Sequence, residues 1–352
     1  MPRDLQKAGE DSETGHMNRY SRQIILKEIG TIGQERIGSS RIAVVGLGAT
    51  GGIIAELLAR AGAGHLRLID RDTVEFSNLQ RQILYDETDV GMAKTDAAAN
   101  RLQRINNGIE VEPVAKDLHP DNIEPLLKDC DLIMDGTDNI QTRFLINDFA
   151  VKHAIPWIYS GAIGTSGMEM AIIPGKTPCI RCLMPVAPPA GALPACDIAG
   201  VLNTVPAIVG SLATTDAFKI LTETQPRTNF GQLTVFDAWE NSFDHVIVSR
   251  REDCTCCEGH QFEYLSARIR GLATRLCGRG SIQINPMRPM EIGLEELARR
   301  LHDLGEVRCI RHMIRFKNGS KELSIFNDGR AIIRGVKDEA EARALYSRYI
   351  GE

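Results

Sequence analysis

The sequence lacks the features of a membrane-bound, secreted or nucleic-acid-binding protein. No stretch approaches the roughly 20 consecutive apolar residues that a membrane-spanning helix needs. Residues 1–16 are polar and contain no apolar core of a signal peptide, so we expect a disordered leader and a cytoplasmic location. The net charge of −5 leaves no overall basic excess, which argues against nucleic acid as a partner.

An even set of cysteines, as in a disulfide framework, is also missing, because the 352 residues include nine cysteines. In a cytosolic chain, clustered cysteines indicate metal binding or catalysis. Six of the nine fall in such places, at positions 179, 182, 196, 254, 256 and 257. We expect the other three, Cys130, Cys277 and Cys309, to be ordinary buried residues.

Strand and helix patterns alternate from Arg41 to about Ser160. Apolar runs such as RIAVVG and HLRLID are typical of strands buried on both faces, and helical segments separate them. Residues 161–250 add a strand pair, a long helix and two closing strands. The pattern predicts an α/β fold with a Rossmann-like, doubly wound, mostly parallel sheet, which further strands extend at its C-terminal side.

The last part of the chain has a different pattern, which predicts a small α+β domain over residues 260–352. Three short strands are expected, joined by hairpin turns at Asn318-Gly319 and Asp328-Gly329. One helix is expected before these strands and one after them. Length alone also suggests about two domains.

A glycine-rich turn follows the first predicted strand. The stretch IAVVGLGATGG places Gly46, Gly48 and Gly51 between a strand and a helix, where backbone amides and the helix dipole bind phosphate. Asp70 lies 24 residues after Gly46, at the end of the next strand, where an acidic residue holds ribose hydroxyls. These residues alone fit NAD as well as ATP.

The polar residues that follow favour a triphosphate. An arginine grips phosphate through two hydrogen bonds and a lysine adds a point charge, so two cations suit ATP better than NAD. Asp135 and Asp138, in DGTDN, lie at the carboxyl end of a predicted strand, and Mg²⁺ binds carboxylates together with phosphate oxygens. The residues predicted to surround the phosphates are Asn78, Arg81, Gln82 and Lys94.

These motifs resemble the ThiF/MoeB family, the bacterial relatives of ubiquitin-activating enzymes. Seven stretches occur in the family's order between Asn18 and Gly259, about two-thirds of the chain: RYSRQIIL, VVGLGATGG, LIDRDTVEFSNLQRQ, VGMAKTDAA, DGTDN, PCIRCL and ACDIAGVL. The resemblance implies that ATP activates the C-terminal carboxylate of a small ubiquitin-like carrier protein, which gives a carrier–AMP anhydride and pyrophosphate. We assign this activity to residues 17–259.

The resemblance also implies roles for single residues. Asp70 would bind the ribose, and Asp138 would hold Mg²⁺. Arg22, in the first motif, would reach the triphosphate of the neighbouring subunit, which implies a homodimer. Acyl adenylation is an in-line attack on the α-phosphate, for which positioning and charge neutralisation supply most of the catalysis. The implied nucleotide loop and phosphate ligands are Gly46, Gly48, Gly51, Asn78, Arg81 and Lys94.

Two Cys-x-x-Cys pairs predict a structural zinc site, because tetrahedral Zn²⁺ takes four thiolates at about 2.3 Å. The pairs are Cys179 with Cys182 and Cys254 with Cys257, and the 71 residues between them imply a metal that ties two distant segments together. The family resemblance implies zinc at the same pairs. Cys256 makes a second spacing available, although spacing favours Cys254 with Cys257. A redox role for either pair is the alternative.

Cys196, in LPACDIAGV, permits two interpretations. In the first, it accepts the activated carrier or takes part in sulfur transfer, as a cysteine at this position does in the thiamine-type relatives. A thiol between a loop and a helix start favours a reactive thiolate. In the second, Cys196 has no role, since the molybdopterin-type relatives activate their carrier without it. A cysteine desulfurase is the candidate sulfur donor.

The predicted function is adenylation of the C-terminal glycine of a sulfur carrier that ends in Gly-Gly, in a thiamine, molybdopterin or tRNA thiolation pathway. Three alternatives stay open: adenylation of a peptide or tRNA, an NAD-dependent oxidoreductase, and a non-catalytic binding module. The lack of a strongly basic patch counts against tRNA. Arg81, Lys94 and Asp138 count against NAD.

The C-terminal domain carries no motif that indicates chemistry, and in particular no rhodanese-like cysteine loop. From Glu258 onward, 17 basic and 13 acidic residues give a net charge of +4. We expect a small packing domain with a solvated face. The alternative is a surface that docks an acidic carrier.

Overall fold

A computed structural model describes residues 19–188, 199–222, 230–266, 274–275, 281–286, 290–310 and 313–351. Within them lie an eight-stranded sheet and a six-stranded sheet. The first has the order β3-β2-β1-β4-β5-β6-β7-β8, and the pairs from β3 to β5 are parallel whereas those from β5 to β8 are antiparallel. The predicted fold class is therefore confirmed.

The eight strands match the alternating pattern of the sequence. Their bounds are β1 Arg41–Val45, β2 His65–Ile69, β3 Glu110–Val114, β4 Leu132–Asp135, β5 Trp157–Ile163, β6 Ser166–Ile172, β7 Gln232–Asp237 and β8 Ser242–Ile247. The helices of this part are α2 Ser21–Ile24, α3 Gly30–Ser39, α4 Ala49–Ala61, α5 Lys94–Ile105, α6 Ile123–Leu127, α7 Ile140–His153, α8 Ile180–Leu183, α10 Thr204–Thr222 and α11 Glu263–Ser266. Two 3-10 turns, η1 Phe76–Asn78 and η2 Glu87–Asp89, lie between β2 and α5.

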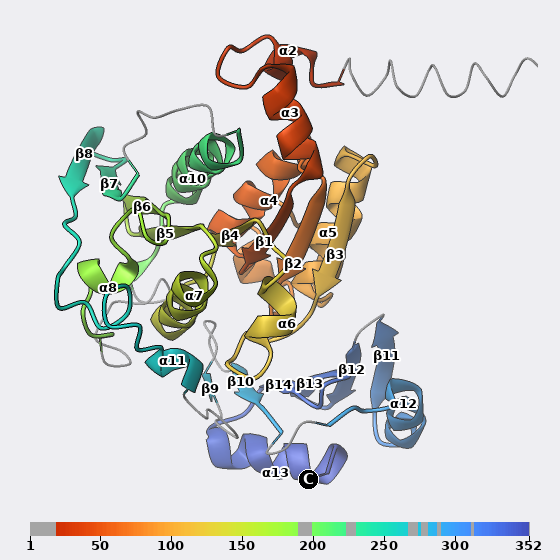
Figure 1. The fold of residues 1–352 in the computed structure, drawn as a ribbon. Coiled ribbons are helices and arrows are strands. Elements are labelled where there is room, and N and C mark those ends of the chain that lie inside the picture. Colours follow the sequence, from red (N-terminus) through yellow and green to blue (C-terminus); the bar gives the residue numbers. More distant parts are fainter. Residues whose placement is uncertain are drawn as a thin grey trace, which may run out of the picture.

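Helices cover both faces of the parallel strands (Figure 1). In β1, Ile42 and Val44 pack with α4, α5 and α10, whereas Ala43 and Val45 pack with α6 and α7. Successive residues of a strand point to opposite faces, so a strand covered on both sides must be apolar throughout, as RIAVV is.

The chain moves outward from β1 to β2 and β3 and then crosses back to β4 on the other side of β1. The carboxyl ends of β1 and β4 are thus neighbours whose following segments diverge. In doubly wound sheets, ligands bind in the crevice at such a point. The topology therefore places the candidate site at the loops after β1 and β4.

The C-terminal part forms the second sheet, in the order β11-β12-β13-β14-β10-β9. Its elements are β9 Thr274–Arg275, β10 Ser281–Ile284, α12 Leu294–His302, β11 Glu306–Ile310, β12 Met313–Asn318, β13 Lys321–Phe326, β14 Ala331–Arg334 and α13 Glu339–Tyr349. The three predicted strands are β12 to β14, and both predicted turns join them. The sequence patterns did not indicate β10 and β11, which add further antiparallel pairs.

Of the cysteines expected to be ordinary and buried, Cys130 is buried and Cys309 is exposed. The prediction for Cys309 is wrong because β11 is an edge strand whose residues are mostly exposed. Cys277 lies outside the described residues. No helix in the described ranges is long and apolar enough to cross a membrane.

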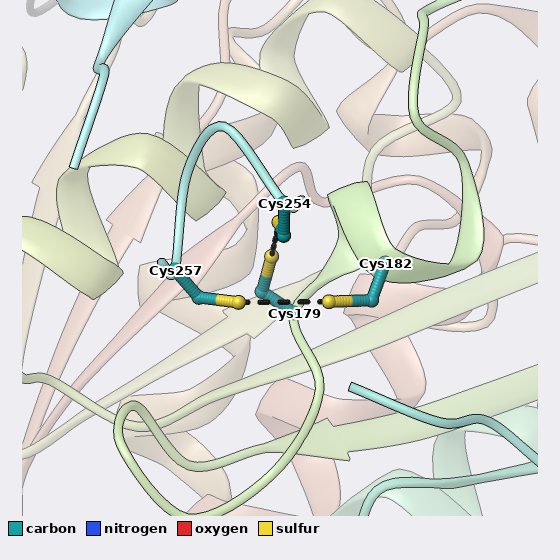
Figure 2. A group of neighbouring side chains, drawn as sticks. All are labelled: Cys179, Cys182, Cys254 and Cys257. Carbon is teal, nitrogen blue, oxygen red and sulfur yellow. Dashed lines mark hydrogen bonds between the residues drawn. The ribbon is translucent and has the colours of Figure 1, made fainter. Parts of the chain in front are cut away.

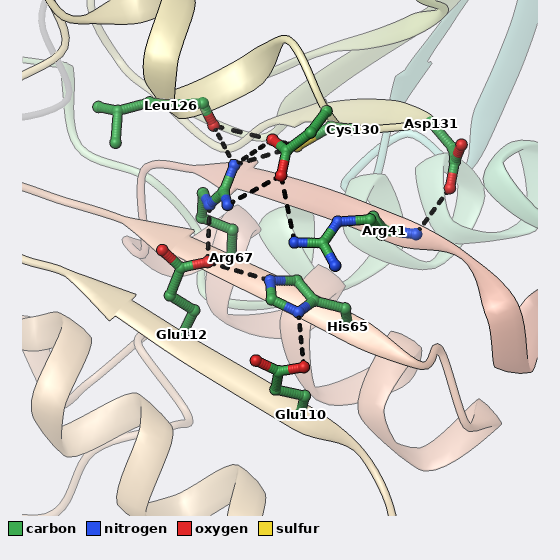
Figure 3. Close-up of polar contacts among 9 residues, drawn as sticks. Arg41, His65, Arg67, Glu110, Glu112, Leu126, Cys130 and Asp131 are labelled. Carbon is green, nitrogen blue, oxygen red and sulfur yellow. Dashed lines mark hydrogen bonds and ion pairs between the residues drawn. The ribbon is translucent and has the colours of Figure 1, made fainter.

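A network of charged residues joins β2, β3 and the segment after α6 (Figure 3). Arg67 donates to Glu112 at 2.8 Å and to Asp129 at 2.5 Å, and His65 lies 3.0 Å from the same Glu112 carboxylate. Burial raises the pKa of the adjacent Cys130 thiol to about 12. Most of these polar groups pair with one another, so we interpret the network as a structural support for the sheet.

Glu169 on β6 provides a test of how buried charge affects stability. It is 5% exposed, and burial together with the nearby Asp216 raises its pKa from 4.5 to about 8. The folded protein therefore holds a proton that the unfolded chain releases at lower pH. Because the folded pKa is the higher one, this contribution to stability is complete below pH 4.5 and is lost as the pH rises through about 8.

We expect the free energy of unfolding to fall across this interval by at most about 1.4 kcal/mol per pH unit, and Glu169→Gln to remove that component. Urea denaturation of the two proteins at a series of pH values measures the difference. Identical pH dependence would contradict the expected titration.

Candidate nucleotide site and cysteine cluster

The glycine loop after β1 lies against the loop after β4. Gly46 has a φ of +85°, and a Cβ on Gly46 would lie 2.7 Å from the backbone of Gly136. A Cβ on Gly51 would lie 1.8 Å from the carbonyl oxygen of Gly46. Side chains at these two positions would force the loops apart, which explains the glycines. The prediction of a strand, a turn and a helix here is met by β1, residues 46–48 and α4.

The first turn of α4 has backbone N–H groups that an anion can use. Gly48 is the N-cap of this 13-residue helix and makes no side-chain cap hydrogen bond. The first amides of a helix lack partners within the helix, and the helix dipole makes this end partially positive. The loop can therefore hold a phosphate through backbone N–H groups.

Asp70 follows β2 and joins the glycine loop. Its carboxylate accepts hydrogen bonds from the backbone amides of Leu47, at 2.6 Å, and Asp72, at 2.7 Å. Burial raises the pKa of Asp70 above its ordinary value, although Lys94 opposes that rise. The carboxylate sits beside the loop, where the sequence prediction placed a ribose ligand.

Residues 75–90 form a segment that we call the phosphate arm. It leaves the sheet after β2 and returns at α5, and it carries Asn78, Arg81 and Gln82. The side-chain oxygen of Asn78 accepts the amide of Glu75 at 3.1 Å, which orders η1. Arg81 donates to the carbonyl of Ser77 at 2.9 Å, so its guanidinium lies along the arm.

Tyr85 of the arm contacts the glycine loop directly, and the side chain of Gln82 lies near the loop. Tyr85 donates its hydroxyl to the carbonyl of Leu47 at 2.9 Å, and Tyr85 is buried. The amide nitrogen of Gln82 lies 4.0 Å from where a Cβ on Gly48 would be. The side-chain amide oxygen of Gln82 is buried and has no hydrogen-bond partner within the described ranges. Tyr85 is a residue of the site that sequence reasoning did not identify.

Lys94 begins α5 and lies buried beside two carboxylates. Its ammonium is 3.2 Å from Asp72. Burial alone would lower the pKa of Lys94, but Asp72 and Asp70 together raise it above its ordinary value. Lys94 is therefore a permanent cation next to the glycine loop.

The two aspartates at the carboxyl end of β4 differ in burial and in their partners. Asp135 is fully buried, pairs with Arg143 at 2.9 Å and accepts the amide of Thr137 at 2.9 Å. Asp138 is exposed, and the structure gives it no hydrogen bond or ion pair within the described ranges. Its charge helps to raise the pKa of Lys94 and of Arg143. Asp135 is committed to the fold, whereas Asp138 is available to a ligand.

Arg143 of α7, which the sequence patterns did not indicate, holds the loop after β4 in place. Beyond its pairing with Asp135, it donates to the carbonyls of Thr137, at 2.5 Å, and Ser160, at 2.6 Å. Its guanidinium lies 4.9 Å from the centre of the Tyr159 ring. An arginine in the first turns of a helix, eight residues after a strand-ending aspartate, is the signal that would have located it.

Arg22 lies far from these residues. It is exposed on α2, and its neighbour Gln23 hydrogen-bonds the carbonyl of Ala61, at the end of α4 opposite to the glycine loop. Figure 1 shows α2 and the C-terminal sheet at opposite ends of the molecule. Within one chain, Arg22 does not reach the glycine loop.

Four of the five cysteines in the two late segments form a compact cluster (Figure 2). Their sulfur atoms lie within 4.8 Å of one another, and all four residues are buried. The Sγ atoms of Cys179 and Cys254 are 3.6 Å apart, and those of Cys182 and Cys257 are 3.5 Å apart. Tetrahedral Zn–S bonds of about 2.3 Å separate sulfurs by about 3.8 Å, so the cluster fits a zinc ion.

Cys256 lies beside the cluster in the same buried core, but it is not one of the four grouped cysteines. It is buried, and its sulfur accepts a hydrogen bond at 3.2 Å from the side-chain amide of Asn147. The other side-chain atom of Asn147, its oxygen, accepts the amide of Ile180 at 3.0 Å. Asn147 thus links the two cysteine segments without entering the cluster. Cys196 lies outside the described residues, and both interpretations of it stay predictions.

The chain was compared with known protein families and curated proteins. The ThiF family matches residues 20–256, and the chain belongs to this family. The Bacillus subtilis (strain 168) protein named sulfur carrier protein ThiS adenylyltransferase is 38% identical over 340 residues, which are 95% of this chain and 99% of that protein. The prediction of an adenylyltransferase is thus confirmed at the level of the family.

Other relatives match a shorter part of the chain. The Thermus thermophilus protein named sulfur carrier protein adenylyltransferase is 39% identical over 247 residues, which are 68% of this chain and 90% of that protein. The SAMP-activating enzyme E1 of Haloferax volcanii is 37% identical over 241 residues, again 68% of this chain. The match to the Bacillus protein covers 95% of the chain and therefore includes most of the C-terminal sheet.

Solved structures support the fold. E. coli MccB with ATP has a TM-score of 0.61 and 22% identity, and the match covers 68% of this chain and 74% of MccB. MccB in complex with N-formylated MccA has a TM-score of 0.62 and 24% identity, covering 70% and 76%. At these identities the likeness concerns the fold alone.

Proposed function

We propose that this protein uses ATP and Mg²⁺ to adenylate the C-terminal glycine of a ubiquitin-like sulfur carrier protein, and that pyrophosphate is released. The observation that carries the proposal is the gathering of an open helix N-terminus, a buried lysine and a free carboxylate at one edge of the sheet. Membership of the ThiF family and relatives named for sulfur carriers support the same chemistry.

The glycine loop and the cations divide the work of binding ATP. The amides at the start of α4 hold a phosphate, and the carboxylate of Asp70 is placed to accept the ribose hydroxyls once it exchanges its contact with Leu47. Lys94, Arg81 and the amide groups of Asn78 and Gln82 face the charge of the triphosphate. The unpaired oxygen of Gln82 is a buried acceptor that a bound nucleotide or water can satisfy.

The reaction needs no protein nucleophile. A carboxylate oxygen of the carrier attacks the α-phosphorus, the new O–P bond forms, and the bond to the bridging oxygen of pyrophosphate breaks with its electron pair. Negative charge grows on the leaving group, and fixed cations stabilise it without reorganisation. Mg²⁺ would neutralise phosphate charge, and the exposed carboxylate of Asp138 would hold it.

The same proposal includes a homodimer and a structural zinc ion. Arg22 contributes to catalysis only if a second chain brings it to the neighbouring glycine loop. Exposed apolar residues close to it, Ile25 at 74%, Leu26 at 49% and Ile32 at 69% exposure, favour burial against another chain. Zinc at the four-cysteine cluster would tie α8 to the segment before α11.

A ThiS-type carrier is the first substrate to test, because the match that spans 95% of the chain is to a relative named for that carrier. Purified protein, ATP and Mg²⁺ are incubated with the carrier, and intact mass is measured. We expect an adduct of one AMP that requires ATP and disappears when the terminal glycine of the carrier is deleted. If a peptide or a tRNA forms the adduct and no carrier protein does, the proposed substrate is wrong.

A further inference from the structure

One face of the C-terminal sheet is covered by helices and the other faces the phosphate arm. Ile314 and Phe316 of β12 pack with α12 and α13, whereas their neighbour Met313 packs with Ala93 at the start of α5. Strand residues alternate between faces, so every second residue belongs to the side without helices. We call this the helix-free face, and it includes Gln283, Met313, Arg315, Phe326, Ile332 and Arg334.

We propose that the helix-free face completes the nucleotide site by fixing the base of the phosphate arm, with Arg334 as the positioning residue. The inference rests on the proposed function, because it assigns the C-terminal domain a part in the same reaction. The proposed role differs from both roles suggested by the composition of this domain, which were general packing and docking of an acidic carrier.

The base of the arm is a short pair of backbone segments. Thr73 and Ala93 form an antiparallel bridge, the amide of Val74 donates to Met92 at 2.9 Å, and the amide of Lys94 donates to Asp72 at 3.0 Å. Everything from Glu75 to Val90 projects from this pair. A shift of the base therefore moves Asn78 and Lys94 together.

Arg334 of β14 binds this base through several charge-assisted contacts. Its guanidinium donates to Glu75 at 2.6 Å and to the hydroxyl of Thr73 at 2.7 Å. Glu75 is the residue whose amide is capped by Asn78. Glu75 thus connects the C-terminal sheet, through its carboxylate, to a predicted phosphate ligand, through its backbone amide. A small cavity lies between Arg334, Asn78 and Lys94.

Glu322 of β13 orients Arg334 from the other side. The carboxylate accepts from Arg334 at 3.0 Å and from Arg315 at 2.9 Å. Burial alone would raise the pKa of Glu322, but these two arginines lower it below its ordinary value. Glu322 stays ionised at neutral pH, and Arg334 is held between two carboxylates with little freedom to turn away.

Arg330 anchors the C-terminal sheet to the strand ends next to the arm. It is 2% exposed and donates to the carbonyls of Arg71 and Ala115, which follow β2 and β3. Its guanidinium lies 3.7 Å from the centre of the Phe326 ring. A buried guanidinium requires such partners, since an unpaired charge there is costly. The anchoring sets where Arg334 meets the arm.

Close packing completes the contact. Ala93 is fully buried with Met313, Phe326 and Ile332. A Cβ added to Gly91 would lie 2.2 Å from the guanidinium of Arg315, so the base of the arm and the sheet approach as closely as glycine permits. The C-terminal sheet thus contacts the base of the arm through ion pairs, backbone acceptors and apolar side chains together. Such close packing can hold the arm in one position, as a positioning function requires.

The test compares Arg334→Met, Arg334→Lys and Glu75→Gln in the full-length protein with Arg308→Ala as the control. Arg308 is in the same sheet, with a side chain that is 71% exposed. For each variant, KM for ATP and kcat are measured by ATP–pyrophosphate exchange, and hydrogen–deuterium exchange is followed without nucleotide or carrier. Zinc content and the melting temperature report on the rest of the fold.

We expect Arg334→Met and Glu75→Gln each to raise KM for ATP by about tenfold, the effect of losing one charge-assisted hydrogen bond. KM for the carrier should be unchanged, Arg334→Lys should recover part of the loss, and the double variant should be no worse than either single one. Faster hydrogen exchange should be confined to residues 72–94. Arg308→Ala should match the parent.

Unchanged KM for ATP together with unchanged hydrogen exchange in residues 72–94 would overturn the inference. So would faster exchange over the whole chain in both Arg334 variants, because it would reduce Arg334 to a general stabilising residue. Failure of the parent to exchange pyrophosphate with any carrier would instead overturn the proposed function. Hydrogen exchange would still decide the role of Arg334, since that measurement needs no substrate.

Discussion

Asp138→Ala should lower the rate of carrier adenylation by about a thousandfold while leaving the free energy of unfolding within about 0.5 kcal/mol of the parent. Asp138 is exposed and has no hydrogen bond or ion pair in the described part of the chain, so the fold loses almost nothing. Under the proposed function, the reaction loses the exposed carboxylate that would hold Mg²⁺. Steady-state rates over a range of Mg²⁺ concentrations measure the effect.

Asp135→Asn provides the matched control, because this substitution should lower stability through the fold and not through the loss of a metal ligand. Asp135 is fully buried and paired with Arg143, so its substitution leaves an uncompensated buried guanidinium. We expect a loss of stability of about 3 kcal/mol. Normal turnover by Asp138→Ala, or equal destabilisation by both variants, would contradict the division of the two carboxylates into ligand and support.

Cys254→Ser should release zinc and lower the free energy of unfolding by about 3 kcal/mol or more. The four-cysteine cluster joins α8 to the distant segment before α11, and its sulfurs lie within 4.8 Å of one another. Without one thiolate, tetrahedral coordination is incomplete and the two segments lose their link. Elemental analysis of the purified protein and urea denaturation measure the two effects.

Cys256→Ser tests whether Cys254 or Cys256 is the zinc ligand that accompanies Cys257. Cys256 hydrogen-bonds Asn147 and stands outside the cluster, so this variant should keep its zinc. It also keeps a hydroxyl that can accept from Asn147, and its stability should change by less than that of Cys254→Ser. Loss of zinc from Cys256→Ser, with zinc retained in Cys254→Ser, would reverse the assignment of ligands.

Local patterns were sufficient for most of the first sheet and for the cysteine pairs. A run such as RIAVV followed by closely spaced glycines defines a strand, a turn and a helix within a few residues. Cys179 and Cys182 are a turn apart, as are Cys254 and Cys257, so each pair has the local geometry that a metal requires. The sequence did not determine how the pairs meet, which depends on α7 and on Asn147.

The contacts of the arm could not be predicted from local sequence patterns. Arg334 and Glu75 are 259 residues apart, and nothing near either residue indicates the other. Tyr85 and Arg143 read as ordinary members of a loop and a helix until the fold places them against the glycine loop and the end of β4. The edge position of β11, which exposes Cys309, is likewise a property of the sheet and not of the strand's own sequence.

ATP–pyrophosphate exchange, with and without carrier proteins that end in Gly-Gly, tests the adenylation directly. Zinc-loaded protein with Mg²⁺ should exchange label between pyrophosphate and ATP only when a matching carrier is present, and a ThiS-type carrier should be the most active. Exchange that is absent with every such carrier, in protein that is folded and contains its zinc, would contradict the proposed function and return the substrate of the glycine loop to an open question.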